Sequence, residues 1–290
     1  MRKVTGRFAP SPTGQLHFGS LIAAAASYLQ AKSAGGRWLV RVENIDPPRE
    51  VAGSAEQILK TLEDFGLRSD EAVLFQSTRR AAHRALVDRL LAEDKAYWCG
   101  CSRRDLPPSG VYPGTCAQGL PPGRQARAVR LRVNAGPVRF HDLIQGPVSE
   151  DLRKTTGDFV IWRADGLPAY QLAVVADDAC QGVTEVVRGC DLLGSTARQV
   201  HVARCLGFEI PEYAHHAVAV NEERKKLGKR YDSDPIGRMG RARALALALR
   251  FLGHDAPGDL PLEELWNWAL QAWDINRVPR RTEGPVPAQQ

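Results

Sequence analysis

Apolar and polar residues follow strand-like and helix-like periods along the first hundred residues. A strand, a helix and a second strand are predicted in that order, at residues 4–8, 21–32 and 37–42. This order forms a βαβ unit, whose ligand site lies at the carboxyl ends of the strands. Two further helices are expected at 54–65 and 78–93, the second capped by Thr78. The pattern therefore predicts an α/β fold.

The period is lost between residues 98 and 136, where Cys, Pro, Gly and Arg predominate. Such a composition is typical of an insertion held together by something other than a large apolar core. Strand-like runs return at 128–133 and 158–163, and the run at 170–175 begins a second α/β stretch. We expect the chain to be helical beyond about residue 241, with three packing anchors: Trp266, Trp268 and Trp273. A Pro-rich tail from Val278 is expected to be disordered.

The loop after the first strand has an unusual composition. Residues 7–20 read Arg-Phe-Ala-Pro-Ser-Pro-Thr-Gly-Gln-Leu-His-Phe-Gly-Ser, and few of them are expected to serve a core. The two prolines make the turn rigid and leave the other N–H groups free, and Gly14 and Gly19 let the backbone approach a ligand. His17 to Ser20 stand near the start of the following helix, where N–H groups and the helix dipole favour anions. The loop indicates a phosphate site; the alternative is a surface turn with one exposed histidine.

Composition bounds the class of protein. The chain is 43% hydrophobic and 25% charged, which is typical of a soluble globular protein, and its 290 residues suit about two domains or one domain with an insertion. Neither a signal peptide nor a bilayer-spanning run is evident, so we expect a cytoplasmic protein without a membrane partner. The formal charge of +6 permits a polyanionic partner. Basic residues cluster at 79–89, 225–230 and 277–281, although each cluster is also consistent with a solvated helix face.

Three of the six cysteines, Cys99, Cys101 and Cys116, lie together in the insertion. Structural disulfides are rare in the cytoplasm, so this group favours zinc over a disulfide. Zinc normally has four ligands, and spacing alone leaves the fourth open. Tyr112, four residues before Cys116, is the nearest oxygen donor. The other cysteines are isolated and are expected to be core thiols: Cys180, Cys190 and Cys205.

Four blocks resemble the class I aminoacyl-tRNA synthetases of the glutamate and glutamine branch. The loop from Arg7 to Gly19 resembles the first class I signature, and Lys226-Leu-Gly-Lys-Arg stands in the place of the second. Residues 41–49 and 188–196 match the same branch, and the blocks are collinear over about residues 4–277. The resemblance implies a Rossmann-like nucleotide-binding fold with a small zinc-binding insertion and a C-terminal helical subdomain.

Within this branch, the chain resembles a shortened paralogue of the glutamyl-tRNA synthetases. Too few residues follow position 277 for the anticodon-binding domain, and Ser20 replaces the final histidine of the first signature. The pattern Cys-x-Cys, Tyr, Cys also matches this paralogue and favours Tyr112 as the fourth zinc ligand. We expect five segments: the first half of the catalytic domain (1–97), the zinc-binding insertion (98–136), the second half with the ATP loop (137–240), a helical stem-contact region (241–277) and the tail (278–290).

The resemblance implies a two-step reaction. ATP would activate L-glutamate to glutamyl-adenylate, and the glutamyl group would pass to the queuosine cyclopentenediol at the wobble position of tRNA(Asp). The partner would be the anticodon stem-loop of that tRNA, and we expect a monomer. Mg²⁺ would accompany ATP, with water and phosphates as its ligands, because no carboxylate pair identifies a protein site. The alternatives are a minimal glutamyl-tRNA synthetase that charges an acceptor end and an inactive tRNA-binding paralogue.

Residue roles carry over at the matching positions. The glutamate set is Arg7, Ala9, Ser11, Glu43, Tyr170 and Arg188. The ATP set is Pro10, His17, Gly19, Ser20, Lys226 and Lys229, of which His17 and Lys229 are the catalytic pair that stabilises the triphosphate and the departing pyrophosphate. The zinc set is Cys99, Cys101, Tyr112 and Cys116. Two arginines suit the two carboxylates of glutamate, because each guanidinium can hold a carboxylate through two hydrogen bonds. Gly228 stands where the second signature usually has serine.

Overall fold

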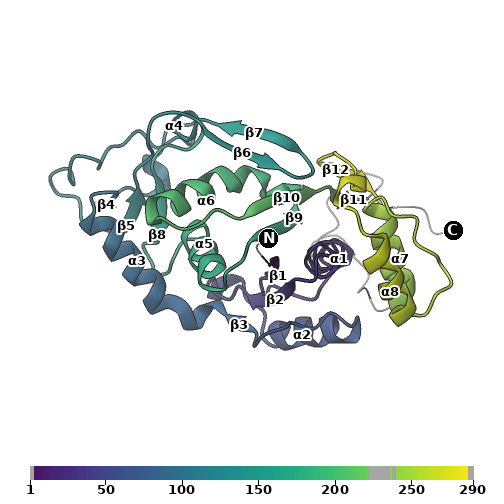
Figure 1. Cartoon of the computed structure of the whole chain (residues 1–290). Coiled ribbons are helices and arrows are strands. Elements are labelled where there is room, and N and C mark those ends of the chain that lie inside the picture. The colour runs from purple at the N-terminus through teal and green to yellow at the C-terminus, as the bar shows by residue number, and fades with distance from the viewer. Residues whose placement is uncertain (1–2, 222–235, 237–239, 287–290) are drawn as a thin grey trace.

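A computed structural model describes residues 3–221, 236 and 240–286 (Figure 1). The N-terminal half begins with the expected βαβ unit: β1 (Thr5–Phe8), α1 (Phe18–Ser33) and β2 (Arg37–Val42). β1 and β2 pair in parallel, and β2 pairs in parallel with β3 (Leu74–Phe75). α2 (Ser54–Asp64) lies between β2 and β3, after a short 3₁₀ turn (Pro47–Arg49). Both strands and both helices that the pattern predicted here are confirmed.

Helix α1 begins three residues before the expected start. His17 caps it: the Ser20 backbone N–H donates to His17 Nδ1 over 3.3 Å, and the His17 N–H donates to Ser20 Oγ over 3.5 Å. These two bonds satisfy donors that a helix start otherwise leaves without partners. His17 is therefore the N-cap of α1, and this role fixes its side chain where the loop after β1 meets the helix.

The prediction that Thr78 caps a helix is wrong. Residues Gln76–Arg79 form a 3₁₀ turn, and α3 (Arg80–Ala92) follows it without a side-chain cap. The Thr78 hydroxyl donates backward to the carbonyl of Phe75 over 2.7 Å. Threonine hydroxyls form such local bonds as readily as they cap helices, so the residue type did not distinguish the two.

A second parallel sheet continues the first. β9 (Glu185–Gly189) pairs in parallel with β10 (Glu212–His216), and β10 pairs with β6 (Val138–Asp142), which forms an antiparallel hairpin with β7 (Gly146–Glu150). The Thr184 N–H donates to the carbonyl of Thr5 over 2.9 Å, which sets β9 beside β1. The strands thus run in the order β3-β2-β1-β9-β10. This is the doubly wound arrangement, with its switch point between β1 and β9.

The inserted segment is attached to an antiparallel sheet. β4 (Ala96–Cys99) pairs with β5 (Ala128–Leu131), and β5 pairs with β8 (Phe159–Trp162). The expected strands at 128–133 and 158–163 are confirmed. A 3₁₀ turn (Arg103–Asp105) lies inside the insertion, and α4 (Leu152–Thr155) follows the β6–β7 hairpin. The sheet shares a core with α3, α5 (Tyr170–Cys180) and α6 (Leu193–Leu206), which a 3₁₀ turn (Cys190–Leu192) precedes.

The C-terminal region is helical, as expected, and packs on α1. It contains α7 (Arg241–Phe251), α8 (Leu262–Ala272) and a 3₁₀ turn (Ile275–Arg277). Trp266 is buried and donates to the carbonyl of Phe65 over 2.7 Å, and Trp273 stacks on His254. Trp268 packs against the same core. All three expected tryptophan anchors are confirmed.

The expected disorder from residue 278 onward is wrong for the described part of the tail. β12 (Glu283–Pro285) pairs in parallel with β11 (Val218–Val220), and Val278 is buried. The Val218 N–H also donates to the carbonyl of Thr282 over 2.9 Å. Residues 287–290 lie outside the described part of the chain.

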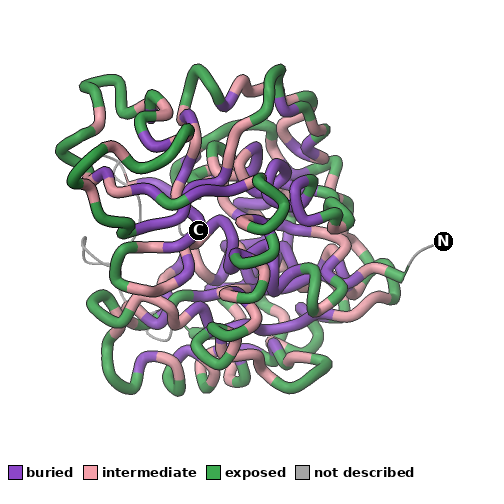
Figure 2. The backbone as a smooth tube through the Cα atoms, turned by 90° about the vertical axis from the view of Figure 1, so that its left-hand side faces the viewer, coloured by how far each residue is buried: buried purple, intermediate pink, exposed green. Residues whose placement is uncertain are grey.

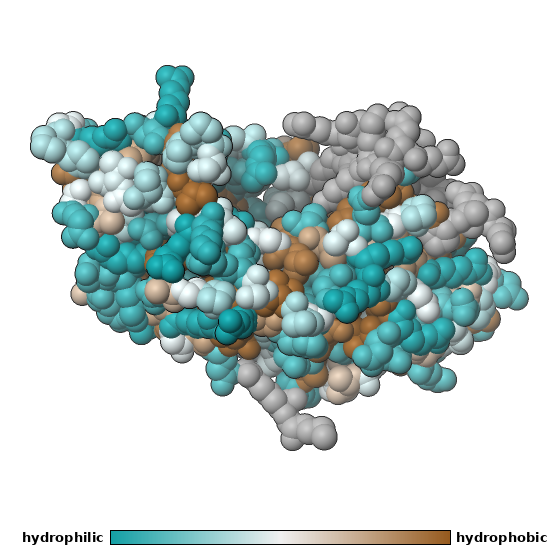
Figure 3. All heavy atoms as spheres, turned by 90° about the horizontal axis from the view of Figure 1, so that it is seen from above, coloured by the Kyte–Doolittle hydropathy of each residue, from teal (hydrophilic) through white to brown (hydrophobic). Residues whose placement is uncertain are grey.

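Buried stretches of the backbone lie mostly inside and exposed loops around them (Figure 2), and the buried hydrophobic residues form two large clusters and one small one. Hydrophilic side chains cover most of the face seen in Figure 3, and hydrophobic ones appear mainly near its middle. Every helix among the described residues is too short or too polar to cross a membrane.

Candidate active site

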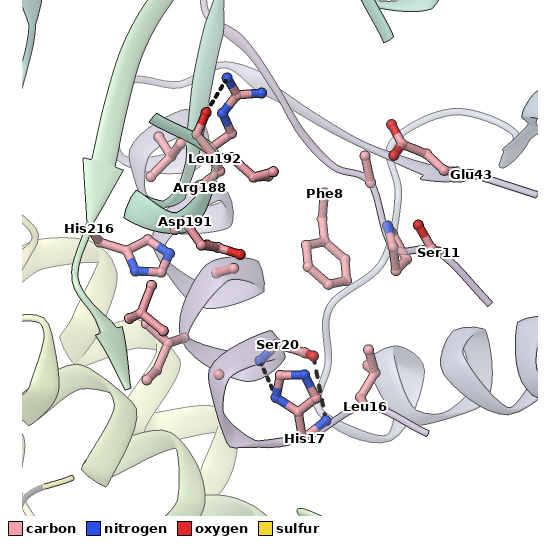
Figure 4. Close-up of a pocket in the computed structure, with 18 of the residues that line it drawn as sticks. Phe8, Ser11, Leu16, His17, Ser20, Glu43, Arg188, Asp191, Leu192 and His216 are labelled. Atoms are coloured by element: carbon pink, nitrogen blue, oxygen red, sulfur yellow. Dashed lines mark hydrogen bonds between the residues drawn. The ribbon is translucent and has the colours of Figure 1, made fainter. Parts of the chain in front are cut away.

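A cavity of about 340 Å³ opens at the carboxyl ends of β1, β9 and β10. Its wall joins the loop that follows β1, the first turns of α1, the residue after β2 and the start of α5. Figure 4 shows Glu43 and Ser11 on one side of Phe8, Arg188 and His216 on the other, and His17 with Ser20 at the start of α1. The cavity lies at the switch point of the sheet, where doubly wound folds bind their ligands.

The cavity contains every described residue that the sequence assigned to glutamate or to ATP. These are Arg7, Ala9, Pro10, Ser11, His17, Gly19, Ser20, Glu43, Tyr170 and Arg188. Segments more than 170 positions apart contribute to it, because β1 and β9 are neighbours in the sheet. Lys226, Lys229 and Gly228 lie outside the described residues.

Two arginines and a carboxylate form the charged end of the cavity. Arg7 and Arg188 are each only 4% exposed, and Glu43 is 8% exposed. Burial raises the pKa of the Glu43 carboxyl above its usual value, although Arg41 and Arg7 oppose the shift. An incoming ammonium group would favour the ionised carboxylate, because an adjacent cation lowers the pKa of a carboxyl group.

Arg7 forms an ion pair with a residue to which the sequence assigned no role. Its Nε lies 3.2 Å from Asp178 Oδ1 on α5. The same Asp178 oxygen pairs over 2.8 Å with the fully buried Arg41, and Arg41 reaches Glu43 over 3.3 Å. Buried charges must be paired to be tolerated, so this chain of ions fixes both Arg7 and Glu43.

Arg188 is held on two of its three nitrogens. Its Nε donates to His215 Nε2 over 2.9 Å, and its Nη2 donates to Thr196 Oγ1 over 2.9 Å and to Gln199 Oε1 over 2.8 Å. Its Nη1 is buried and has no hydrogen-bond partner among the described residues. An unpaired buried donor is costly, so this atom marks a place where a ligand oxygen would be stabilised.

Tyr170 stands at the first position of α5, beside Glu43. Burial raises the pKa of its phenol, so the hydroxyl stays protonated and can donate a hydrogen bond. Because α5 also carries Asp178, one helix positions both the Tyr170 hydroxyl and the carboxylate behind Arg7.

The start of α1 forms the other end of the cavity. His17 Nδ1 accepts the Ser20 N–H, so any proton on this ring is carried by Nε2 when the imidazole is neutral. Gly19 and Ser20 line the cavity beside it. Backbone donors at a helix N-terminus attract phosphate, which agrees with the anion site that the sequence predicted.

Two expectations about this loop are corrected. Several of its residues do serve the core, since Pro10, Pro12, Leu16 and Phe18 are buried. Two of the backbone N–H groups that were expected to be free bond within the protein. The Gly14 N–H donates to Ser54 Oγ over 3.0 Å, and the Thr13 N–H donates to the carbonyl of Ser11 over 2.8 Å. Apolar residues in a turn of this composition pack beneath it and hold its shape.

The three cysteines of the insertion converge as predicted. The Sγ atoms of Cys99, Cys101 and Cys116 all lie within 4.8 Å of one another and are buried. Tyr112 Oη lies 3.4 Å from Cys99 Sγ and 3.8 Å from Cys101 Sγ. Sulfur atoms on a tetrahedral zinc ion stand about 3.8 Å apart, and Cys101 Sγ and Cys116 Sγ are separated by 3.7 Å. Three sulfurs and one phenol oxygen therefore fit a four-coordinate ion.

Two arginines that sequence reasoning missed contact this cluster. Arg130 Nε donates to Cys99 Sγ over 3.2 Å, and its guanidinium stacks on the Tyr112 ring at 3.7 Å. Arg124 Nη1 donates to Cys101 Sγ over 3.2 Å. Burial opposes ionisation of the Cys99 thiol, but hydrogen bonds from Tyr112, the Cys101 N–H and Arg130 outweigh it and lower its pKa. An arginine in a short strand carries no sequence signal for this role.

The remaining cysteines agree only in part with the expectation of core thiols. Cys205 is buried, Cys190 is half-buried and Cys180 is exposed. Cys180 is the last residue of α5 and falls on the solvent side of that helix.

The basic cluster at 79–89 is largely paired within the protein. Arg79 pairs with the buried Asp177. Arg84 pairs with Asp88 and Arg89 with Glu93, in each case four residues further along the chain. In the cluster at 277–281, Arg277 makes a longer ion-pair contact, with 3.7 Å between its Nη2 and Asp255 Oδ2. The cluster at 225–230 lies outside the described residues.

Comparisons with known proteins agree with this architecture. The family model "tRNA synthetases class I (E and Q), catalytic domain" matches residues 3–108 and 122–238. The gap between the two matched segments falls inside the cysteine-bearing insertion.

Curated relatives match along nearly the whole chain. A glutamyl-Q tRNA(Asp) synthetase of Chromobacterium violaceum is 51% identical, over 94% of this chain and 95% of the relative. Proteins of the same name from Aromatoleum aromaticum and Pseudomonas aeruginosa are 48% and 50% identical, over 97% and 95% of this chain. The match covers 92% and 95% of those two relatives.

Solved structures show the same fold. A glutamate tRNA ligase from Elizabethkingia meningosepticum, solved with its amino acid, superposes with a TM-score of 0.83 at 25% identity. A glutamate-tRNA synthetase from Elizabethkingia anophelis gives 0.84 at 26% identity. Each alignment covers 99% of this chain and 68% of the solved chain.

Proposed function

Because the chain belongs to the class I glutamate and glutamine tRNA synthetases, we propose that it transfers glutamate to queuosine at the wobble position of tRNA(Asp). The coarser statement follows from the family itself: the chain is an ATP-dependent ligase that joins glutamate to tRNA. The site observation that supports the proposal most directly is that one cavity is lined both by Arg7, Glu43 and Arg188 and by the start of α1.

Glutamate fits the charged end of the cavity. Arg7 and the unpaired Nη1 of Arg188 would each hold one of its carboxylates, and Glu43 would accept its ammonium. Tyr170 would donate its hydroxyl proton to the substrate, and Ala9 and Ser11 would contact it from the loop. Two cations opposite one anion match the charges of an amino acid with two carboxylates.

ATP fits the end at α1. His17 and the N-terminus of α1 would bind the triphosphate, beside Pro10, Gly19 and Ser20. Lys226 and Lys229 would close over the phosphates, as the resemblance implies. Mg²⁺ would be held by the phosphates and water.

Activation then needs positioning and charge neutralisation instead of a protein nucleophile. An α-carboxylate oxygen of glutamate attacks the α-phosphorus, and the bond from that phosphorus to the β-bridging oxygen breaks. Pyrophosphate would leave with a hydrogen bond from His17 Nε2 and with its charge balanced by Lys229. Holding the carboxylate with an arginine opposite a fixed phosphate site supplies the alignment on which such reactions depend.

Transfer completes the reaction. A hydroxyl oxygen of the cyclopentenediol attacks the adenylate carbonyl carbon, which forms an ester and releases AMP and the hydroxyl proton. The names of the relatives support queuosine as the acceptor, since the chain shares about half of its residues with them over nearly their whole length. The anticodon stem-loop of tRNA(Asp) would bind through its phosphates, and a cytoplasmic location would suit this substrate.

We also propose that Cys99, Cys101, Cys116 and Tyr112 hold one structural zinc ion. Zinc would stabilise an insertion whose own buried cluster is small: Tyr97, Cys99, Cys101, Tyr112 and Cys116. Arg130 and Arg124 would balance the negative charge of the thiolates.

The proposal is tested by the choice of acceptor. Purified protein, ATP and labelled glutamate are incubated with tRNA(Asp) that carries queuosine, with tRNA(Asp) that lacks it, and with tRNA(Glu). Label on the first RNA alone would support the proposal. Label on tRNA(Glu) would favour the minimal glutamyl-tRNA synthetase, and absence of label would favour the inactive paralogue.

A further inference from the structure

Arg188 and His215 are cross-strand neighbours at the carboxyl ends of β9 and β10. The two residues are in register in the parallel pair, and both are buried. Arg188 Nε donates to His215 Nε2 over 2.9 Å. Because arginine has only donors, this bond requires that His215 Nε2 carries no proton.

Asp142 fixes the proton on the other ring nitrogen. Asp142 Oδ2 lies 2.5 Å from His215 Nδ1, and Asp142 Oδ1 accepts backbone N–H groups of Ile144, Gln145 and His215 at 2.8 to 3.1 Å. With four donors around it, the buried Asp142 carboxylate stays ionised and accepts the Nδ1 proton. Burial also lowers the pKa of His215, so the ring is neutral with its proton on Nδ1.

The remaining contacts leave one direction open for Arg188. Thr196 and Gln199 on α6 accept from Nη2, and the ring of Tyr213 lies 5.4 Å from the guanidinium. Of the three guanidinium nitrogens of Arg188, only Nη1 is buried without a hydrogen-bond partner among the described residues, and Arg188 lines the cavity. The network therefore orients the guanidinium and leaves Nη1 able to donate to a substrate carboxylate.

We propose that His215 is a positioning residue for glutamate: its bare Nε2, fixed by Asp142, holds Arg188 so that Nη1 meets a substrate carboxylate. The inference rests on the proposed role of Arg188 as a glutamate-binding residue. His215 itself does not touch the substrate. It acts by removing the rotational freedom of the arginine before glutamate arrives, which lowers the entropic cost of binding.

Two substitutions of His215 separate positioning from packing. Asparagine places its amide near Nδ1, so His215→Asn keeps a donor for Asp142 and removes the acceptor for Arg188. Glutamine places its amide oxygen near Nε2, so His215→Gln keeps the acceptor for Arg188 and removes the donor for Asp142. The assay is glutamate-dependent exchange of pyrophosphate into ATP, with KM for glutamate and for ATP measured separately and the melting temperature recorded for each variant.

His215→Asn is expected to raise KM for glutamate about 10- to 100-fold, the loss typical of a hydrogen bond to a charged group, with KM for ATP within about twofold. His215→Gln is expected to stay within about threefold of the unaltered protein. The proposal would be overturned if His215→Gln raised KM for glutamate as much as His215→Asn does. It would also be overturned if His215→Asn raised KM for glutamate and KM for ATP equally. If the asparagine variant does not fold, Thr196→Val removes both an acceptor of Arg188 Nη2 and the hydroxyl that lies 3.2 Å from His215 Nε2. It is expected to raise KM for glutamate selectively, and no rise would overturn the proposal.

Two controls separate this inference from the proposed function. His201, also buried, contacts the carbonyl of Arg132 away from the cavity, so His201→Asn is expected to leave KM for glutamate unchanged. Arg188→Lys is expected to raise KM for glutamate more than any His215 variant. An unchanged value for Arg188→Lys would reject the glutamate role of Arg188, whereas a raised value beside an unchanged His215→Asn would reject the positioning role alone.

Discussion

Arg7 of β1 and Asp178 of α5 form a buried ion pair, with 3.2 Å between Nε and Oδ1, although 171 positions separate them in the chain. The same carboxylate pairs with Arg41, which in turn contacts Glu43. Asp178 and Arg41 thus link Arg7, the proposed carboxylate-binding residue, to Glu43, the proposed ammonium-binding residue.

The first prediction concerns this link. Asp178→Asn removes a buried negative charge from between two buried arginines, so the free energy of unfolding should fall by about 3 kcal/mol. KM for glutamate should also rise, because Arg7 loses its support. Urea denaturation and pyrophosphate exchange measure the two effects. Asp88→Asn, which breaks an exposed pair with Arg84, should change stability by at most about 0.5 kcal/mol, and equal effects of the two variants would contradict the account.

The second prediction concerns zinc. The purified protein should contain about one zinc ion per chain, and Tyr112→Phe should lower zinc affinity while keeping the stack on Arg130. Loss of one ligand should cost at least about tenfold in affinity, measured by competition with a chromogenic chelator. Cys205→Ser, a buried thiol outside the cluster, is the matched control. A fully active, metal-free preparation would show that the cluster is not a zinc site.

The third prediction concerns the second signature. Lys229→Ala should lower adenylate formation about 100-fold or more, because charge on the departing pyrophosphate is no longer neutralised. Binding of tRNA, measured by filter retention, should change little. Lys225→Ala serves as the control for a nearby loss of positive charge. Unchanged pyrophosphate exchange in the Lys229 variant would remove this residue from the mechanism.

The fourth prediction concerns pH. Burial lowers the pKa of His216 from about 6.5 to about 4, so between these values the unfolded chain binds more protons than the folded one. Stability should therefore fall as pH falls through this window and level off below about pH 4, a loss of about 3 kcal/mol from this residue. His216→Gln should flatten this part of the urea-denaturation profile. His141→Gln, at an exposed position, should not, and the same slope in all three proteins would refute the assignment.

The sequence predicted the elements whose patterns are local. The βαβ unit follows from the apolar periods at β1, α1 and β2, and the cysteine cluster follows from spacing within eighteen positions. The start of α1 was placed too late because a histidine cap has no strong local signature. Spacing alone left Tyr112 open as a ligand, and the fold brings its hydroxyl to the sulfurs.

Features that depend on distant pairing were missed. The tail forms β12 because β11 offers an edge about 65 positions earlier, and no local property of a Pro-rich segment indicates that partner. Asp178, Arg41 and His215 were not identified as parts of the site for the same reason. Each acts through a residue on another strand or helix, so its role exists only once the sheet has formed.

The central claim is that the glutamyl group is attached at the wobble nucleoside. The most direct test is to map the label after transfer to queuosine-containing tRNA(Asp), by cutting the RNA with a base-specific nuclease and separating the fragments. Label confined to the anticodon fragment, and sensitive to prior periodate treatment of the cyclopentenediol, is the predicted result. Label on the terminal adenosine would contradict the claim and identify an acceptor-end synthetase.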